Sequence, residues 1–403
     1  MRLAAVSPFI DHRHGTERAF AELLERLAGK ERCEIHLYAQ RVEDLALAQP
    51  GVARSQDCGA IIWHRVPSIP GPHLVQFLAW LFLNSLWRAW DRAMRGLSFD
   101  LIVSPGINCL DAEAVIVHAL FHRLRELARE EPAQGFGTGV FRSFHRRAYY
   151  RLVAGLERRI YADPKVSLAA VSRRTATLLR EEFGRQDVRV IPNGVDTAQF
   201  SPSARLARRS EVRQRRKIQS DGFVLLLIGN DWRVKGIETI FRAMGKLRNL
   251  PVSLLVAGDD SPATFQETAK SLGILERCRF EPSRKDVLDF YAAADVYVSP
   301  SREDSFGLPV AEAMACGLPV ITSPFAGVSE FIQNGMNGFV LRDARDEKEL
   351  AGLLEQLFRD HDLRQRVGET AAASAVEWDW DKNAAAVWEL LQEALSKKLH
   401  TSS

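Results

Sequence analysis

The sequence predicts an α/β protein with two doubly wound domains, each built on a parallel sheet that is covered by helices. Short apolar runs alternate with amphipathic stretches through most of the 403 residues, an order typical of parallel sheets with crossover helices. A turn-rich segment at residues 192–196 interrupts this alternation, which starts again after it. A chain of this length accommodates two domains of about 200 residues.

The expected strands follow this alternation. Those of the first half lie at residues 3–7, 34–38, 61–65, 101–103, 115–117, 166–171 and 188–191. Those of the second half lie at residues 223–228, 252–257, 279–280, 296–298, 319–322 and 339–341. Pro8 ends the first apolar run at once, so we expect a first strand there and not a signal peptide. The longest apolar stretch, residues 74–87, is too short to cross a bilayer.

The composition excludes several classes of protein. A hydrophobic fraction of 46% and a charged fraction of 26% are ordinary for a globular chain. The net charge of +3 is too small to indicate a nucleic-acid partner, and no nucleic-acid-binding motif accompanies it. The five cysteines are scattered, without C-x-x-C spacing. This favours a reducing compartment, and neither a disulfide framework nor a zinc site. We therefore expect a cytoplasmic protein.

The segment at residues 299–320 concentrates the chemistry. It follows an apolar run, turns at Gly307 and continues into a helix-favouring run. A strand, a glycine loop and a helix start aim backbone N–H groups at one point, where an anion is welcome. Asp304 and Glu312 bracket this loop. Because carboxylates repel phosphate, they are better suited to accept hydrogen bonds from hydroxyl groups. Phosphate beside a polyhydroxyl group indicates a sugar nucleotide.

These residues resemble those of a known family. Asp304, seven intervening residues and Glu312, followed by Ala-Met-Ala-x-Gly-x-Pro-Val, resemble the acidic-pair signature of family four of the retaining, GT-B-fold glycosyltransferases. The first acid is usually Glu in that family, and Glu303 stands beside Asp304 here. Residues 191–196 are similar to the interdomain segment of the family.

This resemblance implies a GT-B fold. Residues 1–195 are then expected to form an acceptor-binding, Rossmann-like domain, and residues 196–375 the nucleotide-sugar-binding one. Residues 376–403 would form a helix that crosses back to the first domain. In such folds the ligand is expected in a cleft between the sheet edges.

The resemblance also assigns the donor site. Glu312 would hold the ribose hydroxyls and Asp304 the hydroxyls of the sugar. Lys235 and Arg233 would bind the diphosphate, where fixed cations stabilise the charge that builds on the leaving group. Asn230 occupies the usual arginine position, so Arg233 is expected to substitute, as in the lipopolysaccharide-core glucosyltransferase branch. The backbone N–H groups expected on the diphosphate are those of Ser305, Phe306, Gly307 and Leu308.

Two further residues are implied in the first domain. Gly15 lies in His-Gly-Thr-Glu-Arg, where the family usually has Gly-Gly-x-Glu-Arg. There it would let the backbone approach the diphosphate, and a plain helix-capping glycine is the alternative. His118 ends an expected strand and resembles the family's cleft histidine, which contacts the donor sugar near the scissile bond. A strand-end histidine of the core is the alternative, and His122 is a weaker candidate for the same role.

The mechanism implied by the resemblance needs neither a metal nor a cofactor, and the nucleotide-diphosphate sugar is a substrate. No placed nucleophile is evident, so front-face substitution with retention is expected, with the leaving phosphate taking the acceptor's proton. Asp379 and Asp381 form an Asp-x-Asp pattern that is typical of metal sites in another glycosyltransferase fold. We interpret it instead as a helix start, where aspartate is favoured as a cap.

Two stretches indicate where the acceptor is located, namely residues 73–97 and 142–159. Both combine aromatic residues with arginines. Such basic helices suit an anionic membrane surface, such as the inner face of the plasma membrane. Helices with solvated arginines on a domain face are the alternative. We thus expect transfer of a hexose to a glycan or lipid-linked acceptor, in lipopolysaccharide, other cell-envelope or exopolysaccharide synthesis. A non-catalytic sugar-nucleotide-binding subunit and a sugar-nucleotide epimerase on the same fold are the alternatives.

Overall fold

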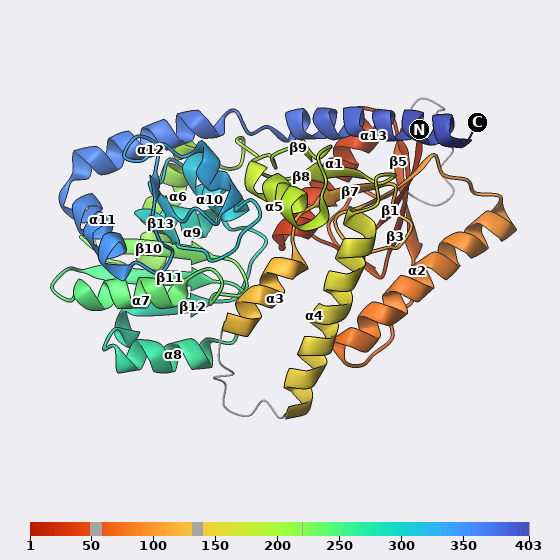
Figure 1. The fold of residues 1–403 in the computed structure, drawn as a ribbon. Coiled ribbons are helices and arrows are strands. Elements are labelled where there is room, and N and C mark those ends of the chain that lie inside the picture. Colours follow the sequence, from red (N-terminus) through yellow and green to blue (C-terminus); the bar gives the residue numbers. More distant parts are fainter. Residues whose placement is uncertain (49–58, 131–139, 220, 403) are drawn as a thin grey trace. The chain divides into compact units, whose positions relative to one another are not determined.

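The computed structural model describes residues 1–48, 59–130, 140–219 and 221–402, with residues 128, 130, 140–147, 401 and 402 described by their backbone alone. It divides into two compact units. Unit 1 comprises Met1–Pro192 and Trp380–Ser403, and unit 2 comprises Asn193–Asp379. The expected boundaries were 195/196 and 375/376. Parallel strands and surrounding helices in each unit confirm the predicted pair of doubly wound, Rossmann-like α/β domains (Figure 1).

Unit 1 contains a seven-stranded sheet in the order β5-β3-β1-β6-β7-β8-β9, with parallel pairing throughout. Its strands are β1 Arg2–Val6, β3 Glu34–Ala39, β5 Ala60–Arg65, β6 Leu101–Ser104, β7 Ala114–Val117, β8 Ser167–Ala170 and β9 Arg189–Val190. Each matches an expected strand to within two residues. The order reverses beside β1, which is the switch point where ligands bind in open α/β sheets.

The helices of unit 1 are α1 Gly15–Gly29, α2 His73–Arg95, α3 Phe121–Glu130, α4 Val140–Tyr161, α5 Arg173–Phe183 and α13 Trp380–Ser402. The expected return of the C-terminal helix is confirmed, because α13 packs on α1, β6 and β8. Its Asp381 accepts a hydrogen bond from Arg26 of α1 at 2.9 Å and pairs with Lys30 as well. Asp381 therefore ties α13 to α1.

A small feature of unit 1 escaped the prediction. Strands β2 Phe9–Ile10 and β4 Arg41–Val42 pair as a separate two-stranded parallel sheet. Each strand has two residues, which is too short to show an alternating pattern.

The polar face of α2 corrects part of the expected membrane surface. Arg88 is 6% exposed and forms a bidentate pair with Asp111, both bonds being 2.7 Å long. Asp91 is buried as well and accepts a hydrogen bond from the Tyr38 hydroxyl at 2.8 Å. Trp80 is also buried. The expectation that Trp80 and Arg88 face a membrane is therefore wrong, because both anchor α2 to the rest of unit 1.

The other expected basic stretch, residues 142–159, lies in α4. The side chains of residues 142–147 are outside those that the structure describes. Among the described residues, no helix combines the length and the apolar character needed to cross a membrane.

Unit 2 contains a six-stranded parallel sheet in the order β12-β11-β10-β13-β14-β15. Its strands are β10 Phe223–Ile228, β11 Val252–Ala257, β12 Cys278–Glu281, β13 Val296–Ser299, β14 Val320–Thr322 and β15 Phe339–Val340. β10 and β11 have the expected bounds, because β10 is a continuous apolar run, β11 is apolar apart from Ser253, and a glycine follows each. Both faces of β10 and β13 are covered, which explains why β10 is apolar along its length and β13 is apolar up to Ser299.

The helices of unit 2 are α6 Pro202–Arg215, α7 Ile237–Lys246, α8 Pro262–Ser271, α9 Leu288–Ala293, α10 Leu308–Ala315, α11 Glu347–Arg359 and α12 His361–Ala375. Short 3-10 turns occur at Leu275–Arg277 and Gly327–Phe331. The helix-favouring run expected after Gly307 is α10, and Gly307 is its N-cap residue.

Candidate active site

Lys235 and Asp304 meet in unit 2, beyond the carboxyl ends of neighbouring strands. Lys235 lies between β10 and α7, and Asp304 lies between β13 and α10. The Lys235 Nζ donates to Asp304 Oδ2 at 2.5 Å. The two side chains are 18% and 14% exposed, so the pair is largely screened from solvent. The structure thus joins two residues that the sequence assigned to neighbouring parts of one donor.

Gly307 brings the start of α10 to the same carboxylate. It has a φ of +95°, in the left-handed region that favours glycine. A Cβ atom placed on it would lie 3.6 Å from Asp304 Oδ2 and 3.2 Å from Val328 Cγ1. Because the first N–H groups of a helix lack intrahelical partners, they form a partly positive end at this point. Lys235, Asp304 and the N-terminus of α10 therefore converge.

The backbone around Asp304 is fixed on both sides. Its N–H donates to the Phe325 carbonyl at 3.0 Å, and its own carbonyl accepts from the Gly327 N–H at 2.9 Å. Phe306 is 3% exposed, and its carbonyl accepts from the Val328 N–H at 2.6 Å. These bonds hold the loop before α10 in one arrangement without using the Asp304 side chain.

Glu312 lies on α10, where it is 3% exposed. Its Oε2 accepts a hydrogen bond from the hydroxyl of Tyr291, on α9, at 2.7 Å. Burial, helped by the nearby Glu312 charge, raises the pKa of Tyr291 well above its ordinary value. Tyr291 thus remains a neutral donor that orients the carboxyl group of Glu312. Sequence reasoning missed Tyr291, because it lies in a six-residue helix outside any motif.

Arg233 and Asn230 occupy the loop between β10 and α7. The Arg233 Nε lies 3.5 Å from Glu238 Oε1, in the first turn of α7. Asn230 Oδ1 accepts from the Asp259 N–H at 2.8 Å, which ties this loop to the one after β11. Asn230 therefore has a structural contact at the position where the family usually has arginine. The role expected of Arg233 stays a prediction.

Gly15 begins α1 in unit 1, and His14 is the N-cap residue. The His14 Nδ1 lies 2.8 Å from Asp11 Oδ2. Although burial favours the neutral form, hydrogen bonds from His14 and Arg13 lower the pKa of Asp11. Burial raises the pKa of Glu17, in the first turn of α1. The start of α1 therefore holds two acids with opposite pKa shifts.

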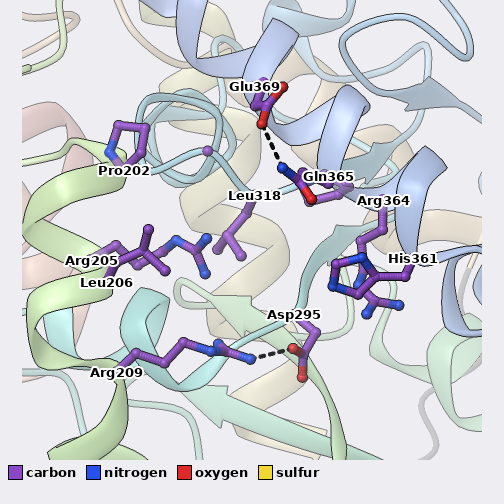
Figure 2. Close-up of a pocket in the computed structure, with 12 residues that line it drawn as sticks. Pro202, Arg205, Leu206, Arg209, Asp295, Leu318, His361, Arg364, Gln365 and Glu369 are labelled. Atoms are coloured by element: carbon purple, nitrogen blue, oxygen red, sulfur yellow. Dashed lines mark hydrogen bonds and ion pairs between the residues drawn. The ribbon is translucent and has the colours of Figure 1, made fainter.

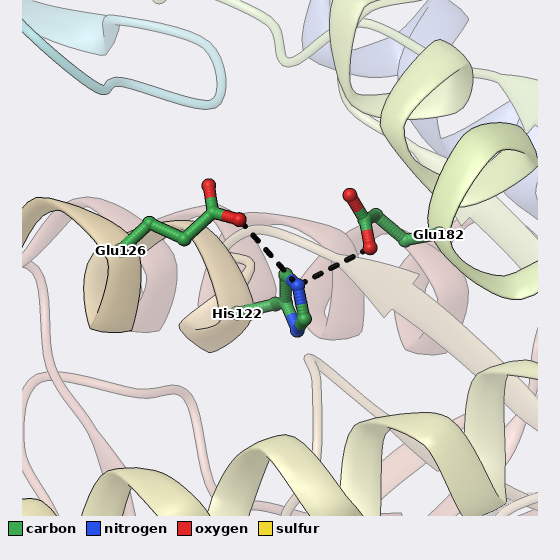
Figure 3. A group of neighbouring side chains, drawn as sticks. All are labelled: His122, Glu126 and Glu182. Atoms are coloured by element: carbon green, nitrogen blue, oxygen red, sulfur yellow. Dashed lines mark ion pairs between the residues drawn. The ribbon is translucent and has the colours of Figure 1, made fainter.

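His118 follows β7 directly, as expected, and its Nδ1 lies 3.2 Å from the carbonyl oxygen of Ile116. His122, the weaker candidate, lies on α3 between two glutamates (Figure 3). Its Nε2 is 3.2 Å from Glu182 and 3.7 Å from Glu126. Arg123 also pairs with Glu126. Glu126 therefore has a cationic partner, Arg123, beside its contact with His122.

Unit 1 has a pocket of about 280 Å³ beyond the carboxyl ends of β1, β3 and β6. Aromatic side chains dominate its wall, and Glu17 and Gln40 are among its polar residues. Its aromatic residues are Phe9, Phe77, Trp80, Phe121 and Tyr149. Aromatic faces beside hydrogen-bonding groups suit a small organic ligand.

Two family descriptions match successive parts of the chain. "Glycosyltransferase Family 4" matches residues 13–199, and "Glycosyl transferases group 1" matches residues 208–374. The first range includes Gly15 and His118, and the second includes Lys235, Asp304 and Glu312. The chain belongs to glycosyltransferase family 4.

Curated relatives of this family 4 chain include several D-inositol 3-phosphate glycosyltransferases. The protein of Paenarthrobacter aurescens is 31% identical over 255 residues, which are 61% of this chain and 60% of the relative. The protein of Salinispora arenicola is 32% identical over 225 residues, which are 52% and 50% of the two chains. The family 4 chain thus spans about half of the length of the curated relatives it matches.

Solved structures resemble nearly the whole family 4 chain. WaaG, a glycosyltransferase involved in lipopolysaccharide biosynthesis, superposes with a TM-score of 0.76 at 20% identity, over 96% of this chain and 98% of WaaG. HepE of Anabaena, in complex with UDP-glucose, gives a TM-score of 0.68 at 19% identity, over 98% and 100% of the two chains. The predicted GT-B fold is thereby confirmed.

Proposed function

We propose that this chain is a retaining, metal-independent glycosyltransferase that moves a hexose from a nucleotide-diphosphate sugar to a glycan or lipid-linked acceptor. The convergence of Lys235, Asp304 and the N-terminus of α10 is the observation that carries this proposal. A cation, a carboxylate and a helix N-terminus suit a ligand that joins a diphosphate to a polyhydroxyl group.

Lys235 can bind the diphosphate while it keeps its hydrogen bond to Asp304. An ammonium group has three N–H donors, and one of them is used by Asp304. The other two point to phosphoryl oxygens, which the N–H groups of Ser305, Phe306, Gly307 and Leu308 also bind. Asp304 in turn accepts hydrogen bonds from the hydroxyls of the sugar. The charge that develops on the leaving diphosphate is stabilised by Lys235, with Arg233 from the same loop.

Glu312 binds the ribose. Two adjacent hydroxyls match the two oxygens of a carboxylate, and the Tyr291 hydroxyl keeps this carboxylate oriented. In unit 1, Gly15 and His118 are the residues that the family resemblance assigns to the donor, and the aromatic pocket is our candidate for the acceptor. The bond between the sugar and the phosphate breaks as the acceptor oxygen attacks the same face. Because attack and departure take place on the same face, the configuration is retained, and the departing phosphate takes the acceptor's proton.

Binding of a panel of nucleotide sugars tests the donor site. We expect one member to raise the thermal midpoint of the protein, because a ligand that binds the folded state alone stabilises it. UDP-glucose is the first candidate, since HepE binds it. Glu312→Ala is expected to abolish this shift. Glu355→Ala is the control, because Glu355 pairs only with the nearby Arg359 among the described residues. An unchanged shift in Glu312→Ala contradicts the proposed site.

The products separate the alternatives. Transfer to a supplied acceptor, with retained configuration by NMR, supports the proposal. Conversion of the sugar without transfer indicates an epimerase, and binding without turnover indicates a non-catalytic subunit. Glycans, lipid-linked sugars and D-inositol 3-phosphate are the acceptors to supply first, the last because the curated relatives are named for it. Lipopolysaccharide precursors should also be supplied, because WaaG is involved in lipopolysaccharide biosynthesis.

We further propose that α2 rests on an anionic membrane at the inner face of the plasma membrane. Large apolar residues spaced three or four apart are exposed along α2, namely Val75, Leu78, Phe82, Leu86, Trp90 and Met94. Arg92 and Arg95 follow in the last turn, and the acid of this helix, Asp91, is buried. An apolar stripe with basic residues at its end suits the boundary of anionic lipids.

Flotation with vesicles tests this contact. The protein is expected to float with phosphatidylglycerol vesicles and to stay behind with phosphatidylcholine vesicles. Joint replacement of Phe82 and Met94 by Ser removes side chains that are 68% and 69% exposed, and flotation should be lost. Joint replacement of Val376 and Leu399 by Ser is the control, because these residues are 61% and 62% exposed on other helix ends. If both variants float equally well, the proposed contact between α2 and the membrane is contradicted.

A further inference from the structure

Unit 2 has a pocket at the amino ends of its central strands, whereas the candidate active site lies beyond their carboxyl ends. Figure 2 shows residues that line this pocket. Asp295 and Pro319 line it and directly precede β13 and β14. Asp304, in contrast, follows the carboxyl end of β13. Helices α6 and α12 form the other walls, and the pocket has a volume of about 350 Å³. This is within the range of pockets that hold small ligands.

Arginines dominate the charge of this pocket. Arg205 and Arg209 come from α6, and Arg364 comes from α12. The carboxylate of Asp295 is held by Arg209 at 2.5 Å and by Arg213 at 3.1 Å, and it also accepts from a backbone N–H. This acid is already shared by two guanidinium groups, and among the described residues neither Arg205 nor Arg364 forms an ion pair.

Arg205 is the residue whose charge is least balanced. Its Nε donates to the Cys316 carbonyl at 2.8 Å. Within the described part of the chain, no carboxylate pairs with its guanidinium group, and Figure 2 shows this group extending toward Leu318 in the pocket. Burial, with the neighbouring Arg209, lowers the pKa of Arg205 to about 10. The group is therefore still charged at neutral pH, at a cost that an anionic ligand would offset.

Arg364 faces the same space from α12. Its Nη1 donates to the carbonyls of Leu357 at 2.5 Å and Phe358 at 3.3 Å, which fixes the direction of the side chain. Beside it on α12, the Gln365 Nε2 donates to Glu369 Oε1 at 2.9 Å (Figure 2). The pocket thus combines guanidinium groups with an exposed amide and carboxylate pair.

The walls of the pocket are held rigidly by a close contact between backbones. A Cβ atom placed on Gly368 of α12 would lie 2.4 Å from the carbonyl oxygen of Gly317, and one on Gly317 would lie 3.2 Å from Pro202. Side chains at these two positions would force α6, α10 and α12 apart. The spacing of the arginines is therefore set before any ligand arrives, which lowers the cost of binding.

We propose that this pocket binds a small phosphorylated metabolite, whose phosphate is held by Arg205 and Arg364 and whose hydroxyls contact Gln365 and Glu369. Guanidinium groups bind phosphate through paired N–H donors. A carboxylate and an amide accept and donate hydrogen bonds to hydroxyls. The site is distinct from the proposed donor site, which lies at the other edge of the sheet, so its test does not depend on transferase activity.

Calorimetry at constant ionic strength tests this proposal with the full chain carrying Lys235→Ala, which removes one of the two cations of the donor site. The probes are inorganic phosphate and glycerol 3-phosphate. We expect both to bind, and glycerol 3-phosphate to bind more tightly because its hydroxyls reach Gln365 and Glu369. Adding Arg205→Gln or Arg364→Gln is expected to weaken binding at least tenfold. Arg208→Gln is the matched control, because Arg208 lies on α6 but pairs with Asp286 and Asp289.

The binding affinities of the variants and of the two probes decide the proposal. Equal affinity in the Arg205→Gln, Arg364→Gln and Arg208→Gln proteins overturns the proposal, as does the absence of binding heat with either probe. Equal affinity for the two probes overturns the role of Gln365 and Glu369 and assigns the pocket to free phosphate. If Arg205→Gln fails to fold by circular dichroism, Arg205→Lys replaces it. Lysine keeps the charge and loses the paired donors, so weaker binding still supports the proposal and unchanged binding contradicts it.

Discussion

Lys235 shows how one side chain can both support and use its site. Its bond to Asp304 fixes the ammonium group before a ligand binds. We expect Lys235→Ala to lower kcat on the order of 10²-fold, the scale of losing a preorganised charge-stabilising donor, while KM for the donor changes less. Steady-state kinetics at saturating donor measure this difference. A larger effect on KM than on kcat would mean that Lys235 binds the ground state instead.

Glu157 gives a prediction about pH. This fully buried residue accepts hydrogen bonds from the backbone N–H groups of Phe121 and His122, at 2.7 and 2.8 Å. Burial raises the pKa of Glu157 from 4.5 to about 7. The folded protein therefore binds more protons than the unfolded chain between these values, so this residue's contribution to stability falls as pH rises from 4.5 to 7.

Urea unfolding of the wild type and of Glu157→Gln at pH 5 and pH 7.5 measures this effect. We expect the wild type to lose more stability than the variant between the two pH values, because glutamine does not ionise. An identical loss in both proteins would show that other groups cause the pH dependence.

Individual site residues could be predicted from the sequence where they belong to a recognisable motif. The spacing of Asp304 and Glu312 identified them as a pair, and in the structure Asp304 accepts a hydrogen bond from Lys235. Tyr291 was not predictable, because its contact with Glu312 depends on how α9 packs on α10. The same holds for Asn230, whose partner Asp259 follows a different strand.

The close approach of helix α12 to Gly317 gives a prediction about helix packing. Gly368→Ala puts a methyl group 2.4 Å from the Gly317 carbonyl, and such overpacking costs about 1–3 kcal/mol. Gly352→Ala on α11 is the control, because a Cβ atom there meets nothing within 4 Å. Alanine at this site should stabilise the helix by about 0.5–1 kcal/mol. Opposite shifts of the urea midpoint are expected, and equal shifts would contradict the close contact.

Elements were predictable where burial and pattern agree. β10 is apolar throughout, β11 is apolar apart from Ser253, and a glycine follows each, so their bounds could be predicted to the residue. The sequence of α2 did not reveal that Arg88 is buried, because its partner Asp111 lies in a separate loop. Residues that look alike in an amphipathic pattern can therefore point to opposite faces once tertiary ion pairs form.

The charge distribution of unit 2 predicts how the whole protein responds to metal removal. Lys235 and the start of α10 supply positive charge at the proposed diphosphate site, so a chelator is expected to leave the transfer rate within twofold of its initial value. Transfer assays with and without EDTA, and with Mg²⁺ or Mn²⁺ restored, measure this. A loss that a metal restores would contradict the metal-independent mechanism and direct attention to His122, Glu126 and Glu182.

The division into two units was visible in the sequence as an interruption at residues 192–196, and the observed boundary lies at Pro192 and Asn193. The second boundary was less apparent, because the family resemblance alone indicated that the last helix returns. The ion pairs of Asp381 with Arg26 and Lys30 give the physical reason for that return.

This return has a consequence for biosynthesis. Unit 1 is discontinuous along the chain, with all of unit 2 inserted between its two parts. On the ribosome, unit 2 therefore has all of its residues before unit 1 does. Until α13 emerges, α1, β6 and β8 lack the helix that covers them. The N-terminal part of unit 1 must wait until α13 has been translated, so a premature stop near residue 379 leaves α1, β6 and β8 without this cover.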